Sequence, residues 1–200
     1  NVHPCSRRHL LGVAIVFASV LSGMAGMITN MAPLAIGEGV SKESAATLVL
    51  LYGLGGLTAK VCFALVADRV GPRTLMFASL TGFATGMVCL TQAHYGFWPI
   101  AIGATLVGFF GGYMVPLQSI IVPRIFGERV VGKAMGLLST VTLVPLLLSP
   151  PSLGRVHDVA GSYAPAFAFY ALLAVAVLFL VPRVRLHPRH EAEAAQFAFE

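Results

Sequence analysis

The chain consists of long apolar runs separated by short polar connections. Six of these runs, each of about 20 residues, are long enough to cross the hydrocarbon core of a bilayer, which is about 30 Å thick. Backbone polar groups find no partner in lipid, and spanning strands would be shorter and alternating, so we predict six transmembrane helices. They are expected at residues 10–31, 45–67, 74–91, 97–122, 131–153 and 163–181.

The six runs leave no room for a second folded domain. The sequence therefore predicts an all-α membrane protein with one six-helix transmembrane domain, residues 1–186, and a solvated cytoplasmic tail, residues 187–200. The chain starts with Asn1 rather than methionine, and its first apolar run is too long for the core of a signal peptide. We therefore expect the natural protein to begin upstream of Asn1.

Composition agrees with this pattern. The 200 residues are 57% hydrophobic and 10% charged, whereas soluble domains carry about a quarter charged residues. The net charge of +5 sits in short clusters between the runs, so no nucleic-acid partner is expected. Cys5, Cys62 and Cys89 lie far apart and show neither a disulfide framework nor a metal-ligand spacing, and no metal or cofactor is predicted.

Basic residues are distributed unequally between the two sides of the predicted bundle. Cytoplasmic loops are enriched in Lys and Arg, and alternation of the spans places only Lys42 and Arg155 on one side. The other side has Arg7, Arg8, Arg69, Arg73, Arg124, Arg129, Lys133, Arg183, Arg185 and Arg189. Both termini are therefore predicted to be cytoplasmic, in a plasma (inner) membrane. Tyr95, Phe97 and Trp98 fall at a predicted outer boundary, where amphipathic rings are favoured.

Lys60 is the basic residue that falls inside a predicted span. It precedes Asp68 by eight residues, which puts it about 12 Å from the cytoplasmic end of its helix. A lysine near the centre of a spanning helix costs about 2.5–3.5 kcal/mol on insertion scales, and it normally faces a cavity, a counter-charge or a substrate. Snorkelling toward the surface, or a hydrogen bond to a carbonyl, is the structural alternative.

The helical face that bears Lys60 favours the cavity. Gly56, Gly53 and Tyr52 lie four, seven and eight residues earlier, and they form a stripe of small and polar side chains. No Asp or Glu lies within any of the six predicted spans, so this chain offers Lys60 no buried counter-ion. The counter-ion then belongs either to another part of the protein or to a transported solute.

Three other runs carry polar or helix-breaking positions. In the fourth, Pro116 and its glycine neighbours predict a bendable helix with one buried amide, Gln118. In the fifth, Pro145, Pro150 and Pro151 predict that the outer half is not a regular helix. The first has small and polar residues at helical spacing, which indicate a close helix contact or a pore lining: Ser19, Ser22, Gly23, Gly26 and Asn30.

The connection after the second span, ADRVGPR, is rich in charge. Asp68 ends a helix, where the dipole disfavours a carboxylate, so we expect it to pair with Arg69, Arg73 or the N-terminus of another helix. Gly71 and Pro72 predict a tight turn that reverses the chain. From this chemistry alone, an ordinary basic loop remains the alternative.

ADRVGPR also resembles the loop signature of the major facilitator superfamily, Gly-x-x-x-Asp-Arg-x-Gly-x-Arg. Asp68, Arg69, Gly71 and Arg73 match it, and Ala64 stands where the leading glycine is usual. Two later stretches, FGERVVGKAMGL and GRVHDVAGSYAPAFAFY, are similar to the family's loop before its penultimate helix and to its run before the last helix. The resemblance implies a twelve-helix fold in two halves, of which this chain is the C-terminal one and the N-terminal one is missing.

AKVCFALVAD is similar to the eighth helix of monocarboxylate-transporter-like members, in which a basic residue stands at the place of Lys60. The resemblance implies a secondary active transporter that moves a small organic anion by alternating access, in which Lys60 binds a carboxylate and takes part in proton coupling. Lysine lacks the bidentate fork of the commoner arginine, so carboxylate geometry is less fixed. Expected site residues are Lys60, Tyr52, Asn30 and Gln118, with Asp68, Arg69, Gly71 and Arg73 as a gating loop. The expected partners are the solute, membrane lipid and the N-terminal half.

Other classes of protein fit the sequence less well. The chain has no His-Glu-x-x-His and no Gly-x-Ser-x-Gly motif, and His94 and His157 lie in predicted loops, so an enzyme is not expected. A channel would more naturally show a re-entrant filter or a ring of charge. A channel or a non-transporting membrane sensor on the same helices nevertheless remains the alternative function, and a homodimer of six-helix chains remains an alternative assembly.

Overall fold

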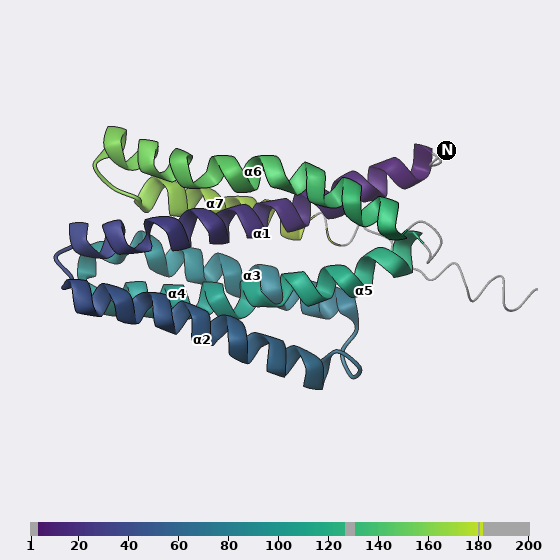
Figure 1. Ribbon diagram of the computed structural model, residues 1–200, viewed down its shortest axis with the longest axis horizontal. Helices are drawn as coiled ribbons and strands as arrows, with labels where there is room; N and C mark the ends of the chain where they lie inside the picture. Colours follow the sequence, from purple (N-terminus) through teal and green to yellow (C-terminus); the bar gives the residue numbers. More distant parts are fainter. Residues whose placement is uncertain (1–3, 127–130, 180, 182–200) are drawn as a thin grey trace, which may run out of the picture.

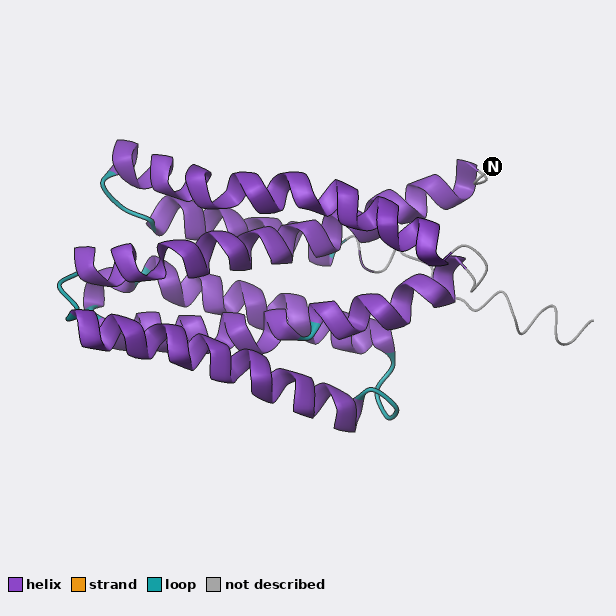
Figure 2. Cartoon of the chain, in the orientation of Figure 1, coloured by secondary structure: helices purple, strands orange, loops and turns teal. Residues whose placement is uncertain are grey.

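The computed structural model describes residues 4–126, 131–179 and 181, and these residues form helices and short turns without a strand (Figures 1 and 2). The predicted tail and Arg129, Arg183, Arg185 and Arg189 lie outside the described residues. The helices are α1 (Pro4–Gly37), α2 (Lys42–Val66), α3 (Pro72–Thr91), the 3₁₀ turn η1 (Ala93–Tyr95), α4 (Phe97–Gly112), α5 (Met114–Phe126), α6 (Val131–Ala160) and α7 (Ala164–Leu178). Each of the six predicted spans is confirmed as helix, the fourth as the pair α4 and α5.

Five stretches are long and apolar enough to cross a membrane: Gly12–Gly37, Lys42–Val66, Pro72–Thr91, Phe97–Ile125 and Val131–Ala160. Helix α7 is a shorter apolar helix. The all-α fold and a membrane protein that crosses the bilayer several times are thus confirmed by length and composition.

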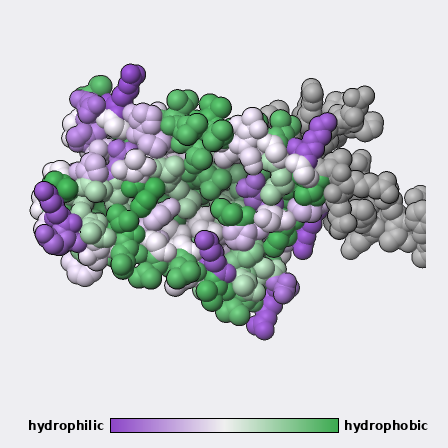
Figure 3. Space-filling model, viewed as in Figure 1, coloured by the Kyte–Doolittle hydropathy of each residue, from purple (hydrophilic) through white to green (hydrophobic). Residues whose placement is uncertain are grey.

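The helices run side by side along one long axis (Figure 1). Helix α2 packs mainly on α4, α6 packs mainly on α1, and α3 lies between α4 and α7. In Figure 1, α6 and α2 border the face toward the viewer, with α1 and α5 between them. The left end bears the α1–α2 and α6–α7 turns, whereas the right end bears the N-terminus and the α2–α3 turn. Figure 3 shows this face as a mixture of hydrophobic and intermediate residues, with hydrophilic residues mostly toward its ends and a few between them.

Small residues let α2 approach α4 closely. A Cβ added to Gly55 would lie 2.7 Å from the Thr105 carbonyl oxygen, and one added to Gly112 would lie 2.9 Å from the Ala59 Cβ. A Cβ on Gly108 would collide with the Tyr52 carbonyl oxygen. Close backbone approach of this kind is typical of helix pairs in membranes, where packing rather than hydrophobic burial drives association.

The first span makes the close contact that its small residues predicted. A Cβ on Gly23 would lie 2.7 Å from the Phe83 ring, and one on Gly26 would meet the Ser149 hydroxyl. Ser19 and Ser22 are buried, and each donates its hydroxyl hydrogen to a carbonyl three residues earlier in α1. Of the two readings of this stripe, the structure therefore supports helix packing for these four residues.

The interruption predicted around Pro116 falls at Tyr113, between α4 and α5. Proline has no N–H, so Pro116 cannot donate to the carbonyl four residues earlier, that of Gly112, where α4 ends. Gln118 is half-buried on α5 rather than buried. The interruption of the helix was thus predicted correctly, but the degree of burial of the amide was not.

The prediction that the outer half of the fifth span departs from a regular helix is wrong. Helix α6 continues through Pro145, Pro150 and Pro151 to Ala160. Proline in a spanning helix is tolerated where side-chain hydroxyls and neighbouring helices supply polar partners. Two bonds join α6 to α1 in this region, since the Asn30 amide of α1 donates to the Pro150 carbonyl oxygen at 3.2 Å and the Ser149 hydroxyl donates to the Ser22 carbonyl oxygen. They hold this part of α6 on α1, although the carbonyls that the three prolines free are those of Val141, Leu146 and Leu147.

Candidate functional site

Helix α2 presents three different faces. Its buried residues form one stripe, which packs on the rest of the bundle: Ala45, Leu48, Gly55, Ala59 and Phe63. A second face carries exposed apolar side chains: Leu50, Leu54, Leu57, Val61 and Leu65. Gly53, Gly56 and Lys60 form the third, which at 100° per residue lies about 110° around the helix from the leucine face. The apolar face suits lipid, and the small face leaves space beside Lys60.

Lys60 is exposed on this third face. It lies six residues before Val66, so it is about 9 Å from the end of α2. Among the described residues its ammonium makes no ion pair. The Asp158 carboxylate, 3.9 Å from the His157 imidazole, lies at the opposite end of the bundle. No group of acidic, histidine or cysteine side chains in the described ranges fits a metal ion. An intramembrane cation is therefore left without a counter-ion in this part of the chain.

Tyr52 lies on α2 eight residues before Lys60, about 12 Å along the helix. Its side chain is half-buried, and its carbonyl faces Gly108 of α4. The structure thus places Tyr52 at the edge of the α2–α4 contact, on the same helix as Lys60.

Asn30 is engaged with helix α6. Its Nδ2 donates to the Gly26 carbonyl oxygen at 2.9 Å and to the Pro150 carbonyl oxygen at 3.2 Å. Asn30 lies seven residues from the end of α1 at Gly37, whereas Lys60 lies near the opposite end of the bundle. The structure therefore does not bring Asn30 and Lys60 together, and the amide of Asn30 already serves a helix contact.

Gln118 lies on α5, and its Nε2 is 3.9 Å from the Met135 sulfur of α6. A thioether is a weak acceptor, so this contact leaves the amide largely able to bind another group. Two of the predicted site residues, Lys60 and Tyr52, lie on α2, and Gln118 lies on α5. The described residues show no direct contact between the Gln118 side chain and either of the other two. Their grouping around one solute stays a prediction.

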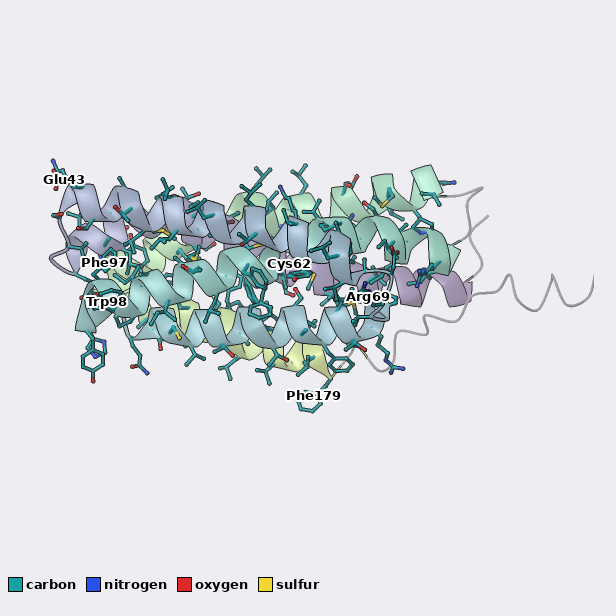
Figure 4. All side chains as sticks on the ribbon, turned by 90° about the horizontal axis from the view of Figure 1, so that it is seen from below. Glu43, Cys62, Arg69, Phe97, Trp98 and Phe179 are labelled. Carbon is teal, nitrogen blue, oxygen red and sulfur yellow. The ribbon has the colours of Figure 1, made fainter. Side chains whose placement is uncertain are left out.

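The predicted gating loop is a short turn at one end of the bundle, where Figure 4 places Arg69, away from Glu43, Phe97 and Trp98. The backbone N–H groups of Arg69 and Val70 both donate to the Val66 carbonyl oxygen, and Pro72 begins α3. The Asp68 carboxylate is exposed and makes no ion pair within the described part of the chain, contrary to expectation. Asp68 is thus open to a partner beyond these residues.

Sequence reasoning missed two polar clusters. At the α4–α5 interruption, the Tyr113 ring packs edge-on against Phe63 with centroids 5.7 Å apart, and its hydroxyl contacts the Cys62 thiol. Between α1, α6 and α7, Tyr170 donates to Ser149 at 2.7 Å, and Ser149 donates to the Ser22 carbonyl oxygen at 2.6 Å. In both clusters the signal was a tyrosine inside an apolar run, since a buried phenol needs a partner.

Comparison with known proteins identifies the class. A sequence model of the Major Facilitator Superfamily matches residues 14–199, almost the whole chain. The chain therefore belongs to this family, and the six helices fit one half-domain of a membrane protein of this kind.

Individual relatives narrow the likeness. The chain is 27% identical to human monocarboxylate transporter 12 over 193 residues, which is 94% of this chain and 37% of the relative. It is 24% identical to Xenopus laevis monocarboxylate transporter 12 over 88% of this chain and 40% of that protein. Bovine monocarboxylate transporter 1 is 29% identical over 70% of the chain and 29% of its own length. The chain thus spans two-fifths or less of these relatives, all of them transporters rather than enzymes by name.

Proposed function

We propose that the protein containing this chain is a secondary active transporter that moves a small organic anion, a carboxylate, by alternating access with proton coupling. The observation that carries the proposal is Lys60, an exposed and unpaired cation on the small-residue face of a spanning helix. The names of the relatives, monocarboxylate transporters, support the same substrate class.

The charge of Lys60 requires compensation within the membrane. An unpaired ammonium at this depth is unfavourable unless it faces water or an anion. No carboxylate of this chain lies in the spans near it, so a solute carboxylate is the counter-ion that we propose. Tyr52 and Gln118 would add neutral hydrogen-bond donors, whereas Asn30 would contribute only in a conformation in which its amide leaves the Pro150 carbonyl oxygen. Protonation of the bound solute or of a neighbouring group would couple transport to protons.

The open faces of α2 and α6 support a second half. Only 17% of an 18-residue apolar stretch of each of these helices is buried, against 50–61% of such a stretch in the other three long spans. We propose that an N-terminal six-helix half faces them across a central cavity, as in transporters whose solute binds at the midplane between two repeats. The turn with Asp68, Arg69, Gly71 and Arg73 would then close the cytoplasmic side, with Asp68 pairing across the halves.

The proposed topology follows the basic residues. Both termini of this chain would be cytoplasmic in a plasma (inner) membrane, with residues 1–186 as the transmembrane half-domain and residues 187–200 as a tail. The membrane lipid and the N-terminal half are then the partners of this chain, besides the solute.

Uptake into vesicles tests the role of Lys60. Vesicles that contain the full-length protein would be given radiolabelled short-chain carboxylates such as lactate, with and without an inward proton gradient. We expect saturable, pH-driven uptake that Lys60→Ala abolishes and Lys60→Arg partly retains. Lys42→Ala is the matched control, because Lys42 is an exposed lysine at the start of the same helix, and it should transport normally.

The other outcomes separate the alternatives. Equal uptake by the wild type and both Lys60 variants would show that Lys60 is structural. Flux at channel rates without saturation would favour a channel, and binding of the carboxylate without flux would favour a membrane sensor.

A further inference from the structure

Helices α6 and α7 are consecutive in the chain yet touch each other little. A groove of about 490 Å³ lies between them, and its main walls are Leu148, Ser149, Ser152, Ala166, Phe169 and Tyr170. This volume is about three times that of an engineered protein cavity of about 150 Å³ that holds benzene, and it falls within the usual range of small-molecule pockets. The groove is therefore large enough for a ligand and lies away from Lys60.

The polar atoms at the floor of the groove are already satisfied within the protein. The Tyr170 hydroxyl donates to Ser149 at 2.7 Å, and Ser149 donates to the Ser22 carbonyl oxygen at 2.6 Å. The Ser152 hydroxyl in the wall donates to the Leu148 carbonyl oxygen at 2.6 Å. No donor is left that requires a polar solute, so the groove is suited to hydrocarbon. One wall of the groove is the spanning helix α6, so the groove lies at the depth of the bilayer, where lipid chains are the abundant hydrocarbon.

A positive charge stands at the end of this groove. Arg155 does not line the groove itself, but it follows the lining residue Ser152 by three positions and Leu148 by seven, which places it at the edge of the groove on α6. It lies near the end of α6, toward the α6–α7 turn and the surface of the bundle. Arg155 is exposed, and within the described ranges its guanidinium makes no ion pair, although Asp158 is close in sequence and pairs with His157 at 3.9 Å.

We propose that the α6–α7 groove is a phospholipid site, in which one acyl chain fills the groove and Arg155 binds the phosphate of the same lipid. The two features lie in the order that a phospholipid has, with the apolar groove inside the span and the cation at its surface end. Guanidinium groups bind phosphate through paired hydrogen bonds, which favours arginine here. Anionic headgroups are expected to bind better, because zwitterionic headgroups carry a competing cation.

Fluorescence quenching by brominated lipids tests this site. In the full-length protein with its native tryptophans, Trp98 included, replaced by phenylalanine, Phe169→Trp would place a single tryptophan in the groove. Vesicles would contain phosphatidylglycerol or phosphatidylcholine brominated in the acyl chain. We expect phosphatidylglycerol to be preferred about fivefold at this position, the effect of one basic residue near a lipid headgroup.

Variants assign the preference to the groove and to its charge. Arg155→Ala should abolish the preference, Arg155→Lys should retain most of it, and Ser152→Leu should reduce quenching by narrowing the groove. Leu172→Trp is the matched control, because Leu172 is an exposed residue on α7 that does not line the α6–α7 groove, and it should show no preference.

Three results would overturn the proposal. One is equal quenching by both lipids at Phe169→Trp, and another is a preference that survives Arg155→Ala. The third is the absence of quenching by either lipid, which would show that protein, from another half or a second copy, covers the groove.

Discussion

Helices α2 and α3 follow one another in the chain and are both apolar spans, but protein covers them very differently. Half of an 18-residue apolar stretch of α3 is buried, because α3 lies between α4 and α7, whereas only 17% of such a stretch of α2 is buried. The mean hydropathy of α2 is the higher of the two, 1.9 against 1.5. Apolarity therefore states that a helix belongs in the membrane, but it does not state whether protein, lipid or a cavity lies beside it.

The same contrast separates α6 from α1. An 18-residue apolar stretch of α1 is 61% buried, whereas the corresponding stretch of α6, which packs on α1, is 17% buried. Helices α2 and α6 border one face of the molecule (Figure 1), and each carries glycines, such as Gly53 and Gly136, at which an added Cβ would meet no other part of the protein within 4 Å. Because both α2 and α6 have few buried residues and uncovered glycines, the bundle is suited to association across that face.

The close contact between α2 and α4 gives the largest expected effect. Gly108→Leu would drive a side chain into the Tyr52 carbonyl and separate the two helices. We expect a loss of about 1–3 kcal/mol in the free energy of unfolding, measured as thermal or denaturant unfolding of the full-length protein in detergent. Gly53→Leu is the control, because nothing lies within 4 Å of its added Cβ, and it should change stability by less than about 0.5 kcal/mol. Equal losses in both variants would contradict the packing described here.

The Ser149 cluster tests how α6 is held on α1. Ser149→Ala would leave the Tyr170 hydroxyl without its acceptor, which should cost about 1–3 kcal/mol of stability, whereas Tyr170→Phe removes one bond and should cost about 1 kcal/mol. Unfolding of the single and double variants would be compared. If Ser149→Ala is as stable as the wild type, the cluster does not hold the two helices together.

The two exposed faces of α2 differ in a way that labelling can measure. In a protein without native cysteines, Gly53→Cys and Leu54→Cys lie at the same depth but about 100° apart around the helix. A thiol reacts as its thiolate, which forms where water reaches, so we expect a membrane-impermeant thiosulfonate reagent to label Gly53→Cys on the order of tenfold faster. Similar rates at both positions would argue against a water-accessible cavity beside Lys60.

The turn between α2 and α3 gives the smallest expected effect. Gly71 has a φ of −60°, which any residue adopts, and no atom lies within 4 Å of its added Cβ. Gly71→Ala should therefore leave the unfolding free energy unchanged to within about 0.5 kcal/mol.

Gly96, with a φ of 97°, is the contrasting position, and Gly96→Ala should cost about 1–3 kcal/mol. A stability loss at Gly71 would reveal a contact from beyond the described residues. Lost uptake with normal stability would instead support a gating role for the turn.

Several features of the fold followed directly from local sequence. The six spans followed from the length of the apolar runs, since a bilayer admits few alternatives to helix. The interruption near Pro116 followed from a missing N–H, and the close contact of Gly23 and Gly26 followed from their spacing. The wrong prediction of a helix break at Pro150 and Pro151 also came from a local rule. Their local rule predicts a break, but polar partners on α1, remote in sequence, accompany a continuous helix.

In the candidate site, too, some features followed from local sequence and others depended on how the helices pack. Lys60 stood out because a charge within an apolar run is costly wherever the helix packs. Asn30 and Gln118 were grouped with Lys60 by residue type. In the structure, the Asn30 amide of α1 instead donates to the Pro150 carbonyl oxygen of α6, near the other end of the bundle. Residue type states what a side chain can bind, and only the packing of helices determines which partner it reaches first.

The sequence by itself determined that this chain is a bundle of membrane-spanning helices of the Major Facilitator Superfamily, because hydrophobic length and loop motifs are local properties. Only the tertiary structure decided which helices lie inside and which remain open, and it placed Lys60 on an open face and Arg155 at the end of a groove. The physical reason is that every span has a similar apolar composition. The burial of a helix therefore depends on which other helices lie beside it, and contacts between residues distant in sequence determine that arrangement.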